Sequence, residues 1–309
     1  MSARLLLLCP GQGGQHEGMN AMALDEPRAA AFLQQAAAPA SALFDNLVAQ
    51  PAVVGATLAM WLALQPRLAA LRLAPALVAG YSVGELSAWG VAGAFSAAET
   101  VRLAHARAKL MTDAAAATAA GAGQTLAAIG GLPLARSAAL AAAHGYAIAI
   151  VNGEDSCVAG GMAHALPALR AQVEAAGGRL QHLPVTVAAH TPLLSAAVRP
   201  FADLLAAAPF GAAACPVLSG VDAVAIDGPH TRERAIDALS RQLAQTIRWA
   251  DCMDAAAESG IAIALELGPG AALARMLAGR HPHIACRSVA EFRSIDGIVK
   301  WLERQADLV

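Results

Sequence analysis

The chain has 309 residues, enough for one large domain or for a domain that carries an insertion. It is 57% hydrophobic but only 4% aromatic, and its formal net charge of −2 provides no basic excess for binding nucleic acid. The mean hydropathy of +0.50 raises the question of a membrane. The best candidate span, residues 46–66, contains two prolines, a glycine and several polar residues, so a buried helix of a soluble protein is expected instead.

The N-terminus and the cysteines indicate the compartment. The run Leu5–Leu8 is too short for the core of a signal peptide and lacks a cleavage region. The 5 cysteines are an odd number without paired or metal-site spacing, which predicts reduced thiols in a cytoplasmic protein. We therefore expect no metal, no tightly bound cofactor and no membrane partner.

Both ends of the chain alternate strand-like and helix-like segments. Expected strands are Leu5–Cys9, Ala76–Ala79, Pro216–Val221, Ile261–Leu267 and Ile284–Val289. Expected helices are Ala52–Leu71, Ser96–Asp113, Arg232–Gln245, Ala271–Leu277 and Ser294–Arg304. Such alternation predicts an α/β fold whose mostly parallel sheet is covered by helices on both faces.

The middle of the chain has a different pattern. After an expected flexible linker, Ala114–Gly123, the predicted elements follow the order β-α-β-β-α-β, which is ferredoxin-like. These elements are Thr125–Ile129, Pro133–His144, Tyr146–Asn152, Ser156–Gly160, Ala163–Ala176 and Arg179–Val185. We predict a small subdomain at 123–186, inserted into a large domain formed by 1–122 and 187–309, with a substrate cleft between them.

The segment Gly80-Tyr81-Ser82-Val83-Gly84 lies between an expected strand and an expected helix. A Gly-x-Ser-x-Gly in this context is typical of a nucleophile elbow, where a sharp turn lifts the serine out at the edge of the sheet. The flanking glycines allow the close backbone contacts of the turn. Ser82 is therefore the candidate nucleophile of an acyl-enzyme.

Ser82 needs a base, and His190 is the most suitable of the 9 histidines. It follows the small subdomain and precedes Thr191-Pro192 at the start of a helix, which places it at the edge of the large domain. A lone histidine is more often a surface or satisfied core residue, and His105 is a weaker candidate.

Two further features have alternative interpretations. The loop Gly11–Gln15 follows the first strand and either presents backbone N–H groups to an oxyanion or is an ordinary glycine-rich turn. Its spacing fits neither a phosphate loop nor a dinucleotide fingerprint. Arg107 lies among small residues of a helix, where it either extends to solvent or faces a cleft and holds a carboxylate.

In combination and in chain order, these motifs resemble the malonyl-CoA:acyl-carrier-protein transacylase family over nearly the whole chain. The matching segments are Pro10–Gly13, Gly80–Glu85, Arg107–Met111, Asn152, His190, Arg241–Leu243 and Glu266–Gly270. The resemblance implies an α/β-hydrolase-like large domain with an inserted ferredoxin-like small subdomain. It also implies malonyl-CoA as donor and a phosphopantetheine-type thiol of an acyl carrier protein as acceptor.

The resemblance also implies residue roles. Ser82 would be acylated, and His190 would be its general base. The backbone N–H groups of Gln12 and Val83 would form the oxyanion hole. Arg107 would hold the free carboxylate of the malonyl group. The backbone carbonyl of Gln242 would orient His190, and Asn152 would line the cleft from the small subdomain.

The chain departs from the usual family pattern at Tyr81 (usually His), Gly14 (usually Ser) and Ala189 (usually larger). Tyr81 with Val83, and the stretch 287–294, most resemble the malonate decarboxylase epsilon subunit, which loads that complex's own carrier subunit. The alternatives are a transacylase of fatty acid or polyketide synthesis, a serine hydrolase, and a non-catalytic docking subunit. A hydrolase would use an acidic side chain between Ser82 and His190, where Asp113 and Asp155 are poorly placed.

Overall fold

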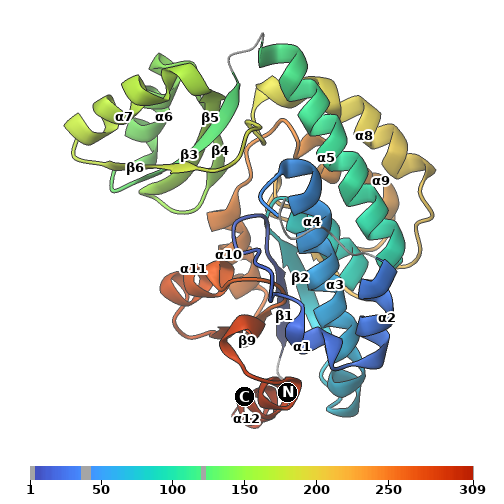
Figure 1. The fold of residues 1–309 in the computed structure, drawn as a ribbon. Coiled ribbons are helices and arrows are strands. Elements are labelled where there is room, and N and C mark those ends of the chain that lie inside the picture. Colours follow the sequence, from blue (N-terminus) through green and yellow to red (C-terminus); the bar gives the residue numbers. More distant parts are fainter. Residues whose placement is uncertain (1–3, 36–42, 120–122, 309) are drawn as a thin grey trace.

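The computed structural model describes residues 4–35, 43–119 and 123–308. The large domain is built on a six-stranded sheet in the order β10-β9-β1-β2-β7-β8, parallel except for the β7–β8 pair. Figure 1 shows the smaller domain, with β3–β6, α6 and α7, at the upper left of the large one. Its strands are β1 (Leu5–Cys9), β2 (Pro75–Gly80), β7 (Val217–Leu218), β8 (Ala225–Ile226), β9 (Ile263–Glu266) and β10 (Ala285–Ser288). The predicted α/β class with a mostly parallel sheet is confirmed.

Helices pack against this sheet because its central strands are apolar throughout. β1 is buried along its whole length, as expected for a strand covered on both faces. The helices of the large domain are α1 (Ala21–Leu24), α2 (Pro27–Gln35), α3 (Asn46–Ala70), α4 (Val83–Val91), α5 (Ala97–Ala119), α8 (Ser195–Ala207), α9 (Thr231–Arg241), α10 (Trp249–Glu258), α11 (Ala272–Arg280) and α12 (Ile295–Ala306).

Helix α3 is the one described helix that is long and apolar enough to cross a membrane. Inside the molecule, however, 78% of its most apolar stretch is buried. It packs against α5 and α4 in the core of the large domain. Its hydrophobicity is therefore accounted for by burial within the fold, as the sequence predicted.

The small subdomain is a four-stranded antiparallel sheet in the order β4-β5-β3-β6. Its elements are β3 (Gln124–Gly130), α6 (Leu134–Ala143), β4 (Ala147–Val151), β5 (Ser156–Met162), α7 (Leu166–Ala175) and β6 (Arg179–Leu183). Successive side chains of a strand point to opposite faces. Ala127 and Ile129 of β3 accordingly join the core under α6 and α7, whereas Leu126 and Ala128 face the large domain.

The structure differs from the sequence predictions at the linker, at the end of α9 and at several elements that the sequence did not predict. The linker expected from Ala114 is wrong over its first part, because α5 continues to Ala119; alanine is the strongest helix former. Positions 120–122 of that linker lie outside the described residues. Helix α9 ends at Arg241, four residues before the predicted end. The helices α1, α2 and α10 and the short strand β8 were not predicted.

Candidate active site

The carboxyl ends of β9, β1 and β2 lie side by side because these strands are parallel neighbours. Loops that leave such ends meet at one edge of a sheet, where ligands of α/β folds usually bind. The edge is occupied by a cavity of about 400 Å³ between the two domains. Its lining residues include Gln12, Ser82 and His190 from the large domain and Leu126 and Val158 from the small one.

Ser82 occupies the turn between β2 and α4. Its backbone has φ 56° and ψ −122°, a region that costs a non-glycine residue conformational energy and is concentrated at functional sites. The turn requires both glycines: a Cβ on Gly80 would overlap the backbone of Gly84, and a Cβ on Gly84 would overlap the carbonyl of Cys9. The elbow predicted from the sequence therefore has its strained geometry.

His190 lies against Ser82, with 2.8 Å between Nε2 and the serine Oγ. Its Nδ1 lies 2.6 Å from the backbone carbonyl oxygen of Gln242. A carbonyl only accepts hydrogen bonds, so Nδ1 carries the proton and Nε2 is free to accept the serine hydroxyl. Burial, reinforced by the charge of Arg107, lowers the pKa of His190 to about 3. The imidazole is therefore neutral near pH 7, and the lone pair of Nε2 is available to the serine proton.

The group that orients His190 is a backbone carbonyl and not a carboxylate. The two acids considered for a hydrolase triad, Asp113 and Asp155, are both exposed, and neither contacts the histidine. The backbone N–H of His190 also donates to the Leu243 carbonyl at 2.9 Å. The segment after α9 thus holds the histidine at two points.

The structure excludes one of the two positions considered for Arg107. It is only 1% exposed, so it does not extend to solvent, and it is not among the residues that line the cavity. Its guanidinium donates to Gln50 Oε1 at 2.6 Å and to Gln242 Oε1 at 3.0 Å. Burial lowers its pKa to about 10, against the charge of Glu85, which raises it. The group therefore stays cationic, and two of its five N–H donors are engaged.

Of the two predicted oxyanion donors, Val83 follows Ser82 in the chain and Gln12 lines the same cavity. Gln12 follows β1, and Val83 is the first residue of α4. Neither backbone N–H has a hydrogen-bond acceptor among the described residues. The first N–H groups of a helix are unpaired within it and attract negative charge.

Asn152 follows β4 and is not part of the cavity wall. Its Oδ1 accepts a hydrogen bond from the Tyr81 hydroxyl at 3.2 Å, which links the small subdomain to the elbow. The Tyr81 ring also packs edge-on against Trp249, with centroids 5.3 Å apart. Asn152 therefore contacts the residue that precedes the nucleophile.

Sequence reasoning did not assign three buried polar residues near the site: Gln50, Glu85 and Glu266. Gln50 is fully buried on α3, and its amide reaches Arg107. Glu266 lines the cavity, and burial raises its pKa to about 7. The available signal was the same for all three, a polar residue in an otherwise apolar segment. In the described ranges 4–35, 43–119 and 123–308, no three His, Cys, Asp or Glu side chains cluster to hold a metal ion.

Comparison with known proteins agrees with this geometry. Residues 6–283 match the acyl transferase domain family. The malonyl CoA-acyl carrier protein transacylase of Salmonella typhimurium is 34% identical over 280 residues, covering 85% of this chain and 88% of the relative.

Solved structures of similar proteins cover almost all of the chain. The malonyl-CoA:acyl carrier protein transacylase of Xanthomonas oryzae superposes with a TM-score of 0.87 at 28% identity, covering 99% of this chain and 100% of that one. A malonyl-transacylase in complex with a type II polyketide synthase acyl-carrier protein superposes with a TM-score of 0.86 at 26% identity, covering 96% and 99%. The chain therefore belongs to the malonyl-CoA:acyl-carrier-protein transacylase family of acyltransferases.

Proposed function

We propose that the chain transfers the malonyl group from malonyl-CoA to the thiol of an acyl carrier protein through a malonyl-Ser82 intermediate. The observation that carries the proposal is the Ser82–His190–Gln242 arrangement, with its 2.8 Å and 2.6 Å hydrogen bonds. The names of the relatives support the donor and the class of acceptor. The reaction would take place in the cytoplasm.

The reaction proceeds in two half-reactions. His190 Nε2 takes the proton of the Ser82 hydroxyl while Oγ attacks the thioester carbonyl. The resulting oxyanion is stabilised by the N–H groups of Gln12 and Val83, each of which is worth about 3 kcal/mol. As the C–S bond breaks, His190 returns the proton to the CoA sulfur. In the second half the carrier thiol gives its proton to His190 and attacks the ester, and Ser82 regains its hydroxyl hydrogen.

Arg107 is proposed to hold the free carboxylate of the malonyl group. Three of its five N–H donors have no acceptor among the described residues, and a planar guanidinium matches a carboxylate in two parallel bonds. Arg107 is linked to the cavity residue His190 through Gln242, which contacts both side chains. Asn152 contributes through Tyr81 at the edge of the same cavity.

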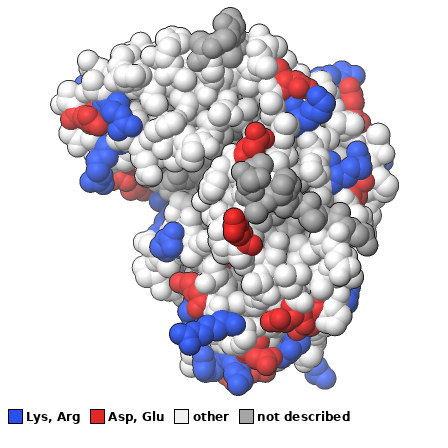
Figure 2. Space-filling model, viewed as in Figure 1, with Lys and Arg blue, Asp and Glu red and all other residues white. Residues whose placement is uncertain are grey.

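For the acceptor, we propose the carrier subunit of malonate decarboxylase. The support is the likeness of Tyr81, Val83 and residues 287–294 to the epsilon subunit of that complex. The alternative is a carrier protein of fatty acid or polyketide synthesis, which the solved polyketide complex favours. The face of the molecule in Figure 2 carries interspersed acidic and basic side chains and identifies no single docking patch.

The test is intact-mass spectrometry after brief mixing with malonyl-CoA, with acetyl-CoA and Ser82→Ala as controls. A malonyl-sized increment on the wild type alone is expected. Holo-carriers of the two kinds are then added in competition, and the malonate decarboxylase carrier is expected to be loaded faster. Free malonate without a stable adduct would favour a hydrolase, and faster loading of the fatty acid carrier would overturn the assigned acceptor.

A further inference from the structure

Gln242 contacts three functional groups at once. Its backbone carbonyl accepts from His190 Nδ1 at 2.6 Å. Its side-chain oxygen accepts from Arg107 at 3.0 Å, and its side-chain nitrogen donates to Glu85 Oε2. The residue is fully buried. The position of this one side chain is therefore linked both to the orientation of the base and to the position of the guanidinium.

Glu85 has no part in the proposed reaction steps, although it lies only three residues after Ser82. It is fully buried on α4, and its Oε2 also accepts the backbone N–H of Gly220 at 3.0 Å. Its Oε1 has no hydrogen-bond partner among the described residues. Burying a carboxylate is costly, and here burial raises its pKa to about 7. A group held at this cost requires an explanation beyond core packing.

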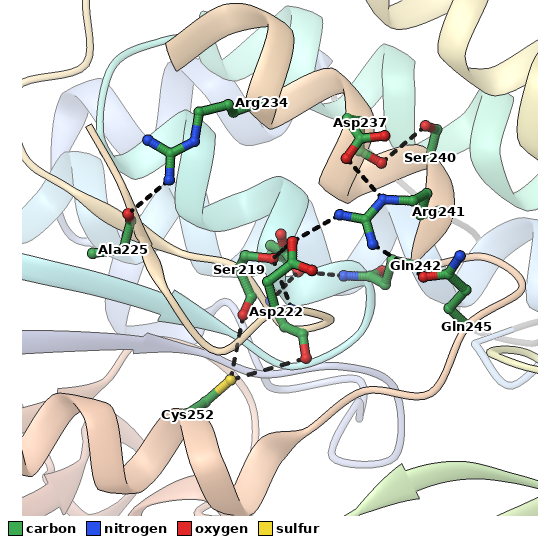
Figure 3. A network of polar contacts seen from close by, with 12 residues as sticks. Ser219, Asp222, Ala225, Arg234, Asp237, Ser240, Arg241, Gln242, Gln245 and Cys252 are labelled. Atoms are coloured by element: carbon green, nitrogen blue, oxygen red, sulfur yellow. Dashed lines mark hydrogen bonds and ion pairs between the residues drawn. The ribbon is translucent and has the colours of Figure 1, made fainter. Parts of the chain in front are cut away.

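The segment around Gln242 is anchored from the other side as well. Figure 3 shows Arg241 between Asp237 and Asp222, at 2.7 Å from a carboxylate oxygen of each. Asp222 also accepts from the Ser219 hydroxyl at 3.1 Å. These bonds tie the end of α9 to the loop at 219–222, the same loop whose Gly220 N–H is bound by Glu85.

We propose that Glu85 is a positioning residue: it fixes the Gln242 side chain and the Gly220 backbone, and thereby holds the Gln242 carbonyl against His190. The inference rests on the proposed transacylase function. Because the nucleophile and Glu85 lie on the same turn into α4, one rigid element aligns the serine directly and its base through Gln242.

The experiment is a double-mutant cycle with Glu85→Met, Gln242→Met and the double variant, in which rates of Ser82 acylation are measured in single turnovers. Each single change leaves a buried partner unpaired, and we expect acylation to slow at least about tenfold. The double variant should be no slower than the single variants, because Glu85 acts through Gln242. Acetyl-CoA should be affected as well as malonyl-CoA, since the misplaced group is the base.

Two further variants separate positioning from general destabilisation. Glu85→Gln keeps an oxygen that accepts both N–H groups, so its kcat should stay within about threefold of the wild type. Ser87→Ala, on the same helix, removes a buried hydroxyl without a partner and should leave acylation unchanged. Substrate KM should change little in Glu85→Met while kcat falls.

Three results would overturn the inference: wild-type rates in Glu85→Met, losses that multiply in the double variant, or a Glu85→Gln variant as slow as Glu85→Met. If Glu85→Met does not fold, Gln242→Met decides, and a rate within threefold of the wild type overturns the inference. Absence of an acyl adduct on the wild type itself would instead contradict the proposed function.

Discussion

Replacement of Arg107 by alanine should abolish the preference for malonyl over acetyl donors. A hydrogen bond to a charged group contributes about 1.5–3 kcal/mol, so two parallel bonds to the malonyl carboxylate contribute at least about 3 kcal/mol. At 1.36 kcal/mol per tenfold in rate, the ratio of malonyl to acetyl acylation should fall roughly a hundredfold. The acetyl rate has no carboxylate to lose, so it reports damage to the rest of the site.

The assay is single-turnover acylation of Ser82 with each donor, expressed as the ratio of the two rates. Loss of the guanidinium also leaves the amide oxygens of Gln50 and Gln242 without their donor. This loss should lower the Tm and the acylation rates with both donors, but it should affect the two rates equally and so leave their ratio unchanged. Arg102→Ala is the matched control, because Arg102 lies on the same helix with its side chain 52% exposed. An unchanged ratio in Arg107→Ala would refute the assignment of the carboxylate grip.

Gly84→Ala should destabilise the fold by several kcal/mol and abolish acylation, because its Cβ would overlap the backbone of β1; Gly279→Ala, in open space on α11, should instead raise the Tm slightly. Urea unfolding and intact mass would measure both. Tyr81→Phe removes only the 3.2 Å bond to Asn152, so a loss of about 1 kcal/mol in unfolding free energy is expected. Losses that add fully in Tyr81→Phe/Asn152→Ala would contradict the pairing. Because the pKa of His190 is lowered to about 3, the imidazole stays deprotonated as the pH falls from 8 to 5, and the acylation rate should not fall through protonation of His190. A decrease in the acylation rate with a midpoint near pH 6.5, caused by protonation of His190, would contradict this.

The fold could be predicted because its signals are local. Most expected strands lie within two residues of those observed, since each is a short apolar run bounded by turn residues. The alanine-rich segment after Asp113 was misjudged because alanine and glycine together suggested flexibility, whereas the alanines continue α5. The helix propensity of alanine was the local signal for the longer helix.

The nucleophile and its base could be located from the sequence, but the surroundings of Arg107 could not. The elbow is a contiguous motif, and His190 follows directly from the end of the small subdomain. The partners of Arg107 are Gln50 and Gln242, which are 57 and 135 residues away in the chain. The contact between Glu85 and Gln242 could not be predicted for the same reason, since 157 residues separate the two in the chain. Long-range polar contacts leave no periodic pattern in a sequence.

The charges around the site explain why a carbonyl orients the base. An ionised carboxylate beside His190 would stabilise the imidazolium, but it would also repel the anionic malonyl group that the proposed reaction must accept. The Gln242 carbonyl holds the same tautomer without a net charge. The nearby acid, Glu85, is instead placed behind the Gln242 amide, and burial favours its protonated form up to about pH 7. In the proposed reaction, the positive charge that binds the malonyl carboxylate is that of Arg107, the sign that a dicarboxylate thioester requires.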